Sequence, residues 1–148
     1  MQQKPIAAFQ YSILIADDDE DDRVLFKDFI SESNMTVIIN DVENGLQLFE
    51  RLKKSALPDY IFLDINMPMM NGKECLKKIR ESKLYNDIKV IMLSTSTDKV
   101  DIEETFKLGA NMFVSKQILF DNYKAVLNRI FRKDIELITK KEYVIPAL

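Results

Sequence analysis

The sequence predicts an α/β fold: a doubly wound, five-stranded parallel sheet with helices on both faces. Runs of four or five apolar residues alternate along the chain with segments whose apolar residues recur at helical spacing. The runs are continuous rather than interleaved with polar residues, as is typical of parallel strands covered on both faces. The chain has 148 residues, of which 47% are hydrophobic, enough for one domain built around such a sheet.

Each predicted strand is an apolar run bounded by polar or turn-forming residues. The runs are SILIA (12–16), TVIIN (36–40), YIFLD (60–64), VIMLS (90–94) and MFVS (112–115). A helix is predicted after each run, with an apolar stripe at spacings of one, three and four residues. The stripes are Leu25, Phe26, Phe29 and Ile30; Leu48, Phe49 and Leu52; Cys75, Leu76 and Ile79; Ile102, Phe106 and Leu108; and Tyr123, Val126, Leu127 and Ile130. Strict alternation of strands and helices predicts helices on both faces of a parallel sheet.

Six acidic residues, 17–22, directly follow the first predicted strand. Asp17 and Asp18 end the strand. Residues 19–22 are expected to cap and open the next helix, where negative charge meets the positive end of the helix dipole. The acidic spacing also resembles a calcium-binding EF-hand loop, but Asp22 stands where that loop needs glycine, which argues against such a site.

The predicted strands end in polar residues that are suited to phosphoryl chemistry. They are Asp17 and Asp18, Asp64, Ser94 and Thr95, and Lys116. In open parallel sheets the carboxyl ends of the strands meet at one edge, where ligands bind. Three clustered carboxylates need a cation to stay ionised together, and oxygen ligands of this kind favour Mg²⁺. A carboxylate neutralised in this way can act as a nucleophile toward phosphorus, with a lysine and a hydroxyl stabilising the remaining oxygens.

The composition excludes several classes of site. Histidine is absent and Cys75 is the single cysteine, which removes Ser-His-Asp catalysis, most zinc sites and an internal disulfide. The net charge of −3 gives no reason to expect nucleic-acid binding. No apolar run approaches the ~20 residues of a membrane-spanning helix. We therefore expect a cytoplasmic protein with neither nucleic acid nor membrane as its partner.

Four motifs in order resemble the receiver domain of two-component response regulators. They are the pair Asp17-Asp18, LDINMPMMNG around Asp64, Ser94 after VIML, and GANMFVSK ending at Lys116. The resemblance covers residues 11–132. It implies the flavodoxin-like strand order 2-1-3-4-5 and a function in a phosphorelay.

The resemblance also implies how the acidic residues act. Asp64 would accept a phosphoryl group from a phosphohistidine of a histidine kinase or a histidine phosphotransfer protein. Asp18, Asp64 and the backbone carbonyl of Asn66 would bind Mg²⁺, with Asp17 acting mainly through a bound water.

Three further residues would respond to phosphorylation. By the same resemblance, Ser94 would hydrogen-bond the phosphoryl group and Lys116 would pair with it. Phe113 takes the place of the family's switch aromatic residue. The switched surface would comprise the fourth and fifth predicted helices and the last predicted strand, and would bind an unidentified downstream protein or a second copy of the chain.

Two residues depart from the family pattern. Gln117 follows Lys116 where the family usually has proline after a cis peptide bond. A cis bond before a non-proline residue costs about 3 kcal/mol, so the sequence leaves the Lys116–Gln117 bond open between cis and trans. Thr95 stands where the family usually has a small residue. It competes with Ser94 for the hydroxyl role, and its branched side chain is expected to narrow access to the phosphoryl group.

The expected organisation has three parts: an N-terminal extension (1–10), the receiver domain (11–132), and a C-terminal helical extension or tail (133–148) without an output domain. The tail has two apolar groups, Ile135, Leu137 and Ile138, and Tyr143, Val144, Ile145 and Leu148. The first group would lengthen the last helix or begin the tail. The second would dock back on the domain or form a dimer contact.

The resulting hypothesis is a stand-alone phosphoacceptor that works by changing a protein-binding surface and is not a conventional enzyme. One alternative is a receiver-like adaptor that is never phosphorylated, for which the Gln117 departure is the main support. Another is a small aspartyl-phosphate phosphatase. That chemistry requires a second carboxylate two residues after the nucleophile, where this chain has Asn66.

Overall fold

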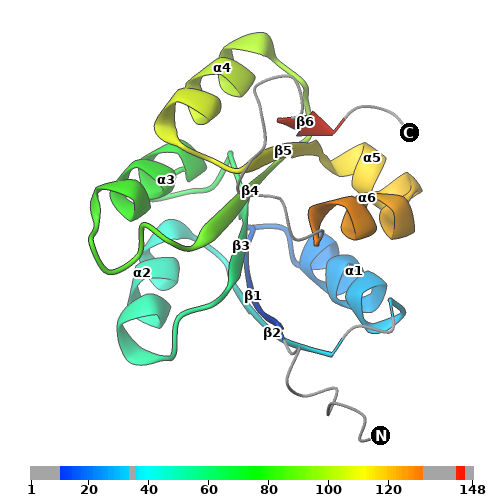
Figure 1. Cartoon of the computed structure of the whole chain (residues 1–148), viewed down its shortest axis with the longest axis horizontal. Coiled ribbons are helices and arrows are strands. Elements are labelled where there is room, and N and C mark those ends of the chain that lie inside the picture. The colour runs from blue at the N-terminus through cyan, green and yellow to red at the C-terminus, as the bar shows by residue number, and fades with distance from the viewer. Residues whose placement is uncertain (1–10, 34–35, 132–142, 146–148) are drawn as a thin grey trace, which may run out of the picture.

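The computed structural model describes residues 11–33, 36–131 and 143–145, and it shows a parallel sheet between two layers of helices (Figure 1). The strands are β1 (Tyr11–Ala16), β2 (Val37–Val42), β3 (Tyr60–Asp64), β4 (Lys89–Ser94), β5 (Met112–Ser115) and β6 (Val144–Ile145). The helices are α1 (Glu20–Ser31), α2 (Gly45–Lys54), α3 (Gly72–Glu81), α4 (Lys99–Leu108), α5 (Lys116–Asp121) and α6 (Tyr123–Ile130). The predicted fold class is confirmed.

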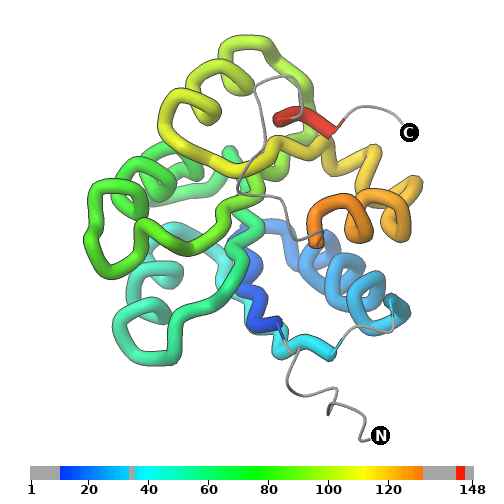
Figure 2. The backbone as a smooth tube through the Cα atoms, in the orientation of Figure 1, coloured from blue at the N-terminus to red at the C-terminus, as the bar shows by residue number. Residues whose placement is uncertain are grey.

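The strand order is β2-β1-β3-β4-β5-β6, and every neighbouring pair is parallel. The first five strands have the order that the resemblance implied. The sixth strand was not predicted: it comes from the tail and pairs with β5, so the sheet is one strand wider than expected. The chain trace in Figure 2 shows this C-terminal segment beside β5, far in sequence from the other strands.

The core has two layers, one on each face of the sheet. On one face, buried residues of the central strands pack against α2, α3 and α4, with Leu48, Leu76 and Ile79 fully buried. On the other face they pack against α1, α5 and α6, with Ile30 and Val126 fully buried. All five residues of β3 are buried, which explains why the central runs are continuously apolar.

Side-chain caps set the starts of four helices. Asp19 caps α1 and accepts a hydrogen bond from the Asp22 amide, as expected for the acidic run. Asn44 and Asp98 cap α2 and α4 in the same way. At α3, Asn71 and Glu74 form a reciprocal capping box. These caps fix the loops that follow β1, β2, β3 and β4 at the carboxyl edge of the sheet.

One further element differs from the prediction. An additional short helix, α5, begins at Lys116 directly after β5, and the predicted fifth helix is α6. Residues 1–10, with the predicted N-terminal extension, and Ile135, Leu137, Ile138 and Leu148 lie outside the described residues. Within the described ranges, no helix is both long and apolar enough to cross a membrane.

Candidate functional site

The predicted strand-end residues lie along one edge of the sheet. Asp17 follows β1, Asp64 ends β3, Ser94 ends β4 and Lys116 follows β5. The strand register places the ends of β3 and β4 side by side, because Asp64 pairs with Leu93, one residue before the end of β4. The edge therefore gathers these residues as the sequence predicted.

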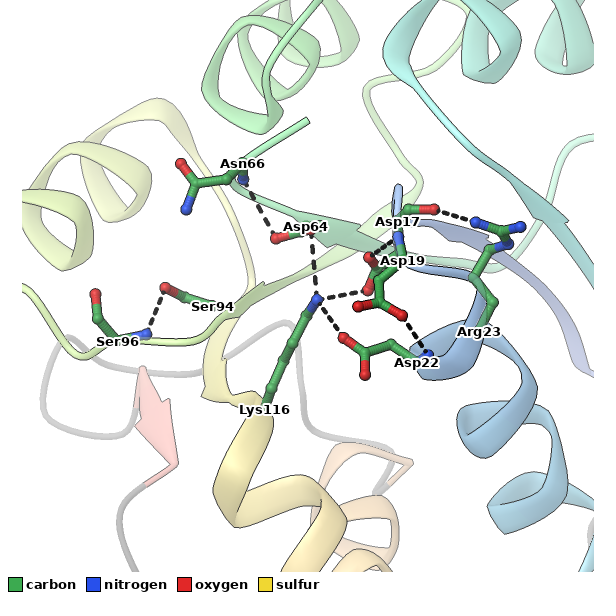
Figure 3. Close-up of polar contacts among 9 residues, drawn as sticks. All are labelled: Asp17, Asp19, Asp22, Arg23, Asp64, Asn66, Ser94, Ser96 and Lys116. Carbon is green, nitrogen blue, oxygen red and sulfur yellow. Dashed lines mark hydrogen bonds and ion pairs between the residues drawn. The ribbon is translucent and has the colours of Figure 1, made fainter. Parts of the chain in front are cut away.

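Lys116 is the centre of the polar contacts at this edge (Figure 3). Its Nζ atom lies 2.7 Å from Asp17 Oδ2, 2.9 Å from Asp22 Oδ2 and 3.4 Å from Asp64 Oδ2. The side chains of Lys116, Asp17 and Asp64 are all buried, so these contacts are shielded from water. One ammonium group thus connects the loop after β1, the first turn of α1 and the end of β3.

The loop that carries Asp17 is held by hydrogen bonds from both sides. The Asp19 amide donates to Asp17 Oδ1 at 3.0 Å, and Arg23 Nη1 donates to the Asp17 carbonyl at 2.8 Å. Arg23 Nε also pairs with Asp41 of β2 at 2.8 Å. This ties the first turn of α1 to β2, so the carboxylate of Asp17 has a fixed orientation toward the edge.

Asp17, Asp18 and Asp64 form a group that could hold a metal ion, because each offers a carboxylate oxygen within 4.8 Å of the others. Asp17 and Asp64 are buried, whereas Asp18 is exposed and closes the group on its solvent side. The donors are all oxygens, which suits a hard cation such as Mg²⁺. The residues present therefore fit the metal that the sequence predicted.

The charge balance at the edge is reflected in two pKa values. Burial raises the pKa of Asp64 to about 7; the Lys116 charge opposes this rise, and the nearby Asp17 carboxylate adds to it. Burial alone would lower the pKa of Lys116, but hydrogen bonds to Asp17 and Asp22 and the charge of Asp64 hold it above its ordinary value. Without a metal, Lys116 stays charged while Asp64 resists ionisation. The positive charge of Lys116 is therefore too small to keep all the nearby carboxylates ionised at neutral pH.

The loop after β3 lies tightly around Asp64. The Asn66 amide donates to Asp64 Oδ1 at 3.2 Å, while the Asn66 side chain is exposed. The Gly72 amide donates to the Ile65 carbonyl at 2.8 Å, and a Cβ atom at Gly72 would lie 2.3 Å from the Asp64 carbonyl oxygen. Only glycine fits at that position, so Gly72 has a structural role in placing the loop.

Ser94, Thr95 and Phe113 lie apart from the ion-pair cluster. Ser94 is buried and on the opposite side of Asp64 from Asp17, and its hydroxyl accepts a hydrogen bond from the Ser96 amide at 3.1 Å (Figure 3). Thr95 is exposed. Phe113 is fully buried and points into the core layer shared with α4. The hydroxyl and switch roles of these residues stay predictions.

The Lys116–Gln117 peptide bond, which the sequence left open, is trans. Lys116 is the first residue of α5, after Ser115 as its N-terminal flanking residue. The start of a helix therefore presents the lysine, where the family pattern would have a cis-proline turn. Its ammonium group nevertheless reaches both Asp17 and Asp64.

Two contributors to the edge were missed from the sequence. Asp22 was expected only to open α1, but it also pairs with Lys116, which is 94 residues away in the chain. Arg23 follows Asp22 and connects the Asp17 loop to Asp41. The signal available in the sequence was Arg23 itself, a basic residue directly after six acidic ones; its partners are the backbone carbonyl of Asp17 and the side chain of Asp41.

Comparisons with known proteins agree with this geometry. The family model of the response regulator receiver domain matches residues 13–128. The chain is 29% identical over 119 residues to the chemotaxis protein CheY1 of Helicobacter pylori, covering 78% of this chain and 95% of that protein. It is 36% identical over 107 residues to the nitrate/nitrite response regulator NarL of Escherichia coli, covering 72% of this chain and 48% of NarL.

Among solved structures, the phosphorylated cyanobacterial phytochrome response regulator RcpA has a similar fold. The TM-score is 0.73 at 25% sequence identity, and the match covers 79% of this chain and 91% of that one.

Proposed function

The chain belongs to the response regulator receiver domain family, and we propose that it is a phosphoacceptor whose Asp64 takes a phosphoryl group from a phosphohistidine on a partner protein. The observation that carries the proposal is the position of Asp64. Its carboxylate is buried at the carboxyl edge of the sheet, where it forms a metal-compatible group with Asp17 and Asp18 and lies 3.4 Å from the ammonium group of Lys116. The relative RcpA is described as phosphorylated, which is consistent with this role.

Mg²⁺ is the cation that we propose for the aspartate group. Asp17, Asp18 and Asp64 would hold it, together with the backbone carbonyl of Asn66. When bound, Mg²⁺ would lower the pKa of Asp64 and neutralise charge on the transferred phosphoryl oxygens. The raised pKa of Asp64 supports this assignment, because the carboxylate needs more positive charge than Lys116 supplies in order to be an anionic nucleophile at neutral pH.

The transfer step exchanges one bond at phosphorus for another. An oxygen of the Asp64 carboxylate forms a bond to phosphorus, and the bond between phosphorus and the histidine nitrogen of the donor breaks. The nitrogen keeps the electron pair of that bond, and Asp64 becomes an acyl phosphate. The chain itself has no histidine, so the donor must be another protein or a small phosphoryl compound.

Two residues would receive the phosphoryl group. Lys116 already lies 3.4 Å from Asp64, and its side chain has four rotatable bonds, so its ammonium group could turn from Asp17 and Asp22 to a phosphoryl oxygen. Ser94, buried at the end of β4, would donate its hydroxyl to a second oxygen. Movement of these two side chains would alter the surface around α4, β5 and α6, which is where we place binding of a downstream protein.

Intact mass spectrometry after incubation with acetyl phosphate and Mg²⁺ tests the proposal. We expect the unaltered chain to gain one phosphoryl group. The gain should be lost in Asp64→Asn and when EDTA removes the metal. A gain that survives in Asp64→Asn would contradict the assignment of Asp64. No gain with acetyl phosphate or with a phosphorylated histidine donor would favour a receiver-like adaptor.

A further inference from the structure

The C-terminal segment Tyr143–Ile145 is bound to the edge of β5. Its strand β6 lies beside β5 (Figure 1). The two strands are parallel, with Val144 opposite Phe113 and Ile145 opposite Val114. The Phe113 amide donates to the Tyr143 carbonyl at 2.9 Å. The segment therefore satisfies backbone groups of a strand that would otherwise present an unpaired edge to its surroundings.

The side chain of Tyr143 fills a pocket between α4 and β5. It is 1% exposed, and its ring packs edge-on against Phe106, with centroids 5.2 Å apart, and at 6.3 Å from the Phe113 ring. The Tyr143 hydroxyl donates to Thr105 Oγ1 at 2.6 Å, and the Thr105 hydroxyl in turn donates to the Asp101 carbonyl at 2.8 Å. The pocket thus recognises a tyrosine by both its ring and its hydroxyl group.

Ile145 fixes the other end of the segment. It is fully buried and belongs to the core layer on the opposite face of the sheet from the Tyr143 pocket. Three consecutive residues therefore supply an aromatic anchor, a strand pairing and an aliphatic anchor. This is the pattern by which extended peptides add a strand to a sheet edge: backbone hydrogen bonds give affinity, and side-chain pockets give specificity.

The pairing of β6 with β5 is also short. β6 has two residues, whereas β1 and β3 pair along several residues at the centre of the sheet. Short edge strands with few contacts open at lower free energy than central strands. Such an opening would expose the β5 edge together with the pocket lined by Thr105, Phe106 and Phe113.

We propose that the β5 edge and the Tyr143 pocket form a binding site for an extended segment of a partner protein that carries a tyrosine followed by two aliphatic residues. The chain's own Tyr143–Ile145 is the resident ligand of this site, and an incoming segment must displace it. The site lies on β5, the strand that leads directly into Lys116, so whatever fills it contacts the element that presents the cation of the acidic edge.

A peptide supplied in trans tests the site on the full-length chain. The probe is a synthetic peptide with the sequence of residues 140–148, KKEYVIPAL, and its matched control has alanine in place of the tyrosine. The resident segment is tethered and so has a high effective concentration. We expect the probe to bind the Tyr143→Ala variant at least roughly ten-fold more tightly than the unaltered chain, and the control peptide to bind neither. Equal affinity for the two proteins, or no binding to Tyr143→Ala, would overturn the proposal.

Two measurements keep the proposal falsifiable if Tyr143→Ala does not fold. Hydrogen exchange on the unaltered chain should show the Phe113 and Ile145 amides exchanging through an opening of lower free energy than the β3 amides. Exchange of these amides only by global unfolding would refute a displaceable segment.

Light scattering should show a monomer at the concentrations used. A dimer that Thr105→Val dissociates would mean that a second copy supplies the segment, which would also overturn the proposal.

Discussion

Lys116 and Asp17 form a buried ion pair across the carboxyl edge of the sheet, with Nζ 2.7 Å from Oδ2 and side chains that are only 7% and 2% exposed. The two residues follow β5 and β1, which are separated in the sheet by β3 and β4. The lysine therefore reaches past Asp64, the residue between them, and neutralises the far side of the cluster. In the absence of a metal, Lys116 is the cation that holds these carboxylates together.

The first prediction concerns the loss of that cation. Lys116→Met would leave Asp17 and Asp64 buried without their positive partner. Breaking a buried ion pair on one side costs about 3–5 kcal/mol, and we expect a loss of that size in the free energy of unfolding, measured by urea denaturation in EDTA. Mg²⁺ should restore part of it. The matched control is Lys83→Met at an exposed site, which should stay within about 0.5 kcal/mol of the unaltered chain. Equal effects of the two substitutions would contradict the prediction.

The second prediction concerns Asp64 in the metal-free protein. Its pKa is raised from 3.8 to about 7, so the folded state binds this proton more tightly than the unfolded chain does. Stability from this group is present at low pH and is lost as the pH rises from about 4 to about 7. Asp64→Asn should remove that loss and stabilise the metal-free protein by a few kcal/mol at pH 7, about 4 kcal/mol at most.

Urea denaturation in EDTA at several pH values measures this effect. Asp28→Asn, at an exposed position of α1, is the control and should not change the pH dependence. A metal-free Asp64→Asn protein that is less stable than the unaltered chain at pH 7 would show that the Lys116 contact outweighs the burial of the charge.

The third prediction separates the metal group from the rest of the acidic run. Asp18 belongs to the group of three carboxylates, whereas Asp21 lies in the first turn of α1. Both are exposed, so Asp21→Asn is a matched control for the loss of one surface charge. We expect Asp18→Asn to weaken Mg²⁺ binding by about ten-fold or more, and Asp21→Asn to have little effect. Calorimetric titration with Mg²⁺ measures both, and similar losses for both would indicate a diffuse electrostatic effect instead of a site.

The fourth prediction concerns the loop around Asp64. In Gly72→Ala the new Cβ would lie 2.3 Å from the Asp64 carbonyl oxygen, which forces the backbone to shift. We expect a loss of about 1–3 kcal/mol in stability and slower phosphorylation by acetyl phosphate. Lys77→Ala, at an exposed position of the same helix, is the control. Unchanged phosphorylation in Gly72→Ala would show that Asp64 does not depend on this close contact.

Much of the fold was predictable because it depends on patterns that the sequence displays directly. The runs that became β1, β3, β4 and β5 are apolar except at an end, since the helices cover both faces of the sheet. The end of each run then placed Asp17, Asp64, Ser94 and Lys116 at one edge without any knowledge of side-chain contacts. The run around residue 38 was predicted two residues short at its end: β2 extends to Val42, because Asp41 and Val42 pair with Ile15 and Ala16 of β1. The polar side chain of Asp41, which pairs with Arg23 and Lys27, interrupted the apolar pattern before that end.

What escaped prediction depends on contacts between distant parts of the chain. β6 has two residues and no periodicity of its own, and it is a strand because it pairs with β5 and because Tyr143 and Ile145 are buried on either side. The helix that begins at Lys116 is six residues long, which is too short for its apolar residues to show a helical spacing in the sequence. Asp22 and Lys116 are 94 positions apart in the chain, so no local sequence pattern indicates that they pair.

The most direct test of the account is to locate the phosphoryl group on the chain. Reduction of the phosphorylated protein with borohydride converts an aspartyl phosphate to homoserine, and peptide mass mapping then identifies the position. The account predicts homoserine at position 64 alone, although Asp17, Asp18 and Asp22 lie around the same edge. Homoserine at any of those neighbours, with Asp64 unmodified, would contradict it.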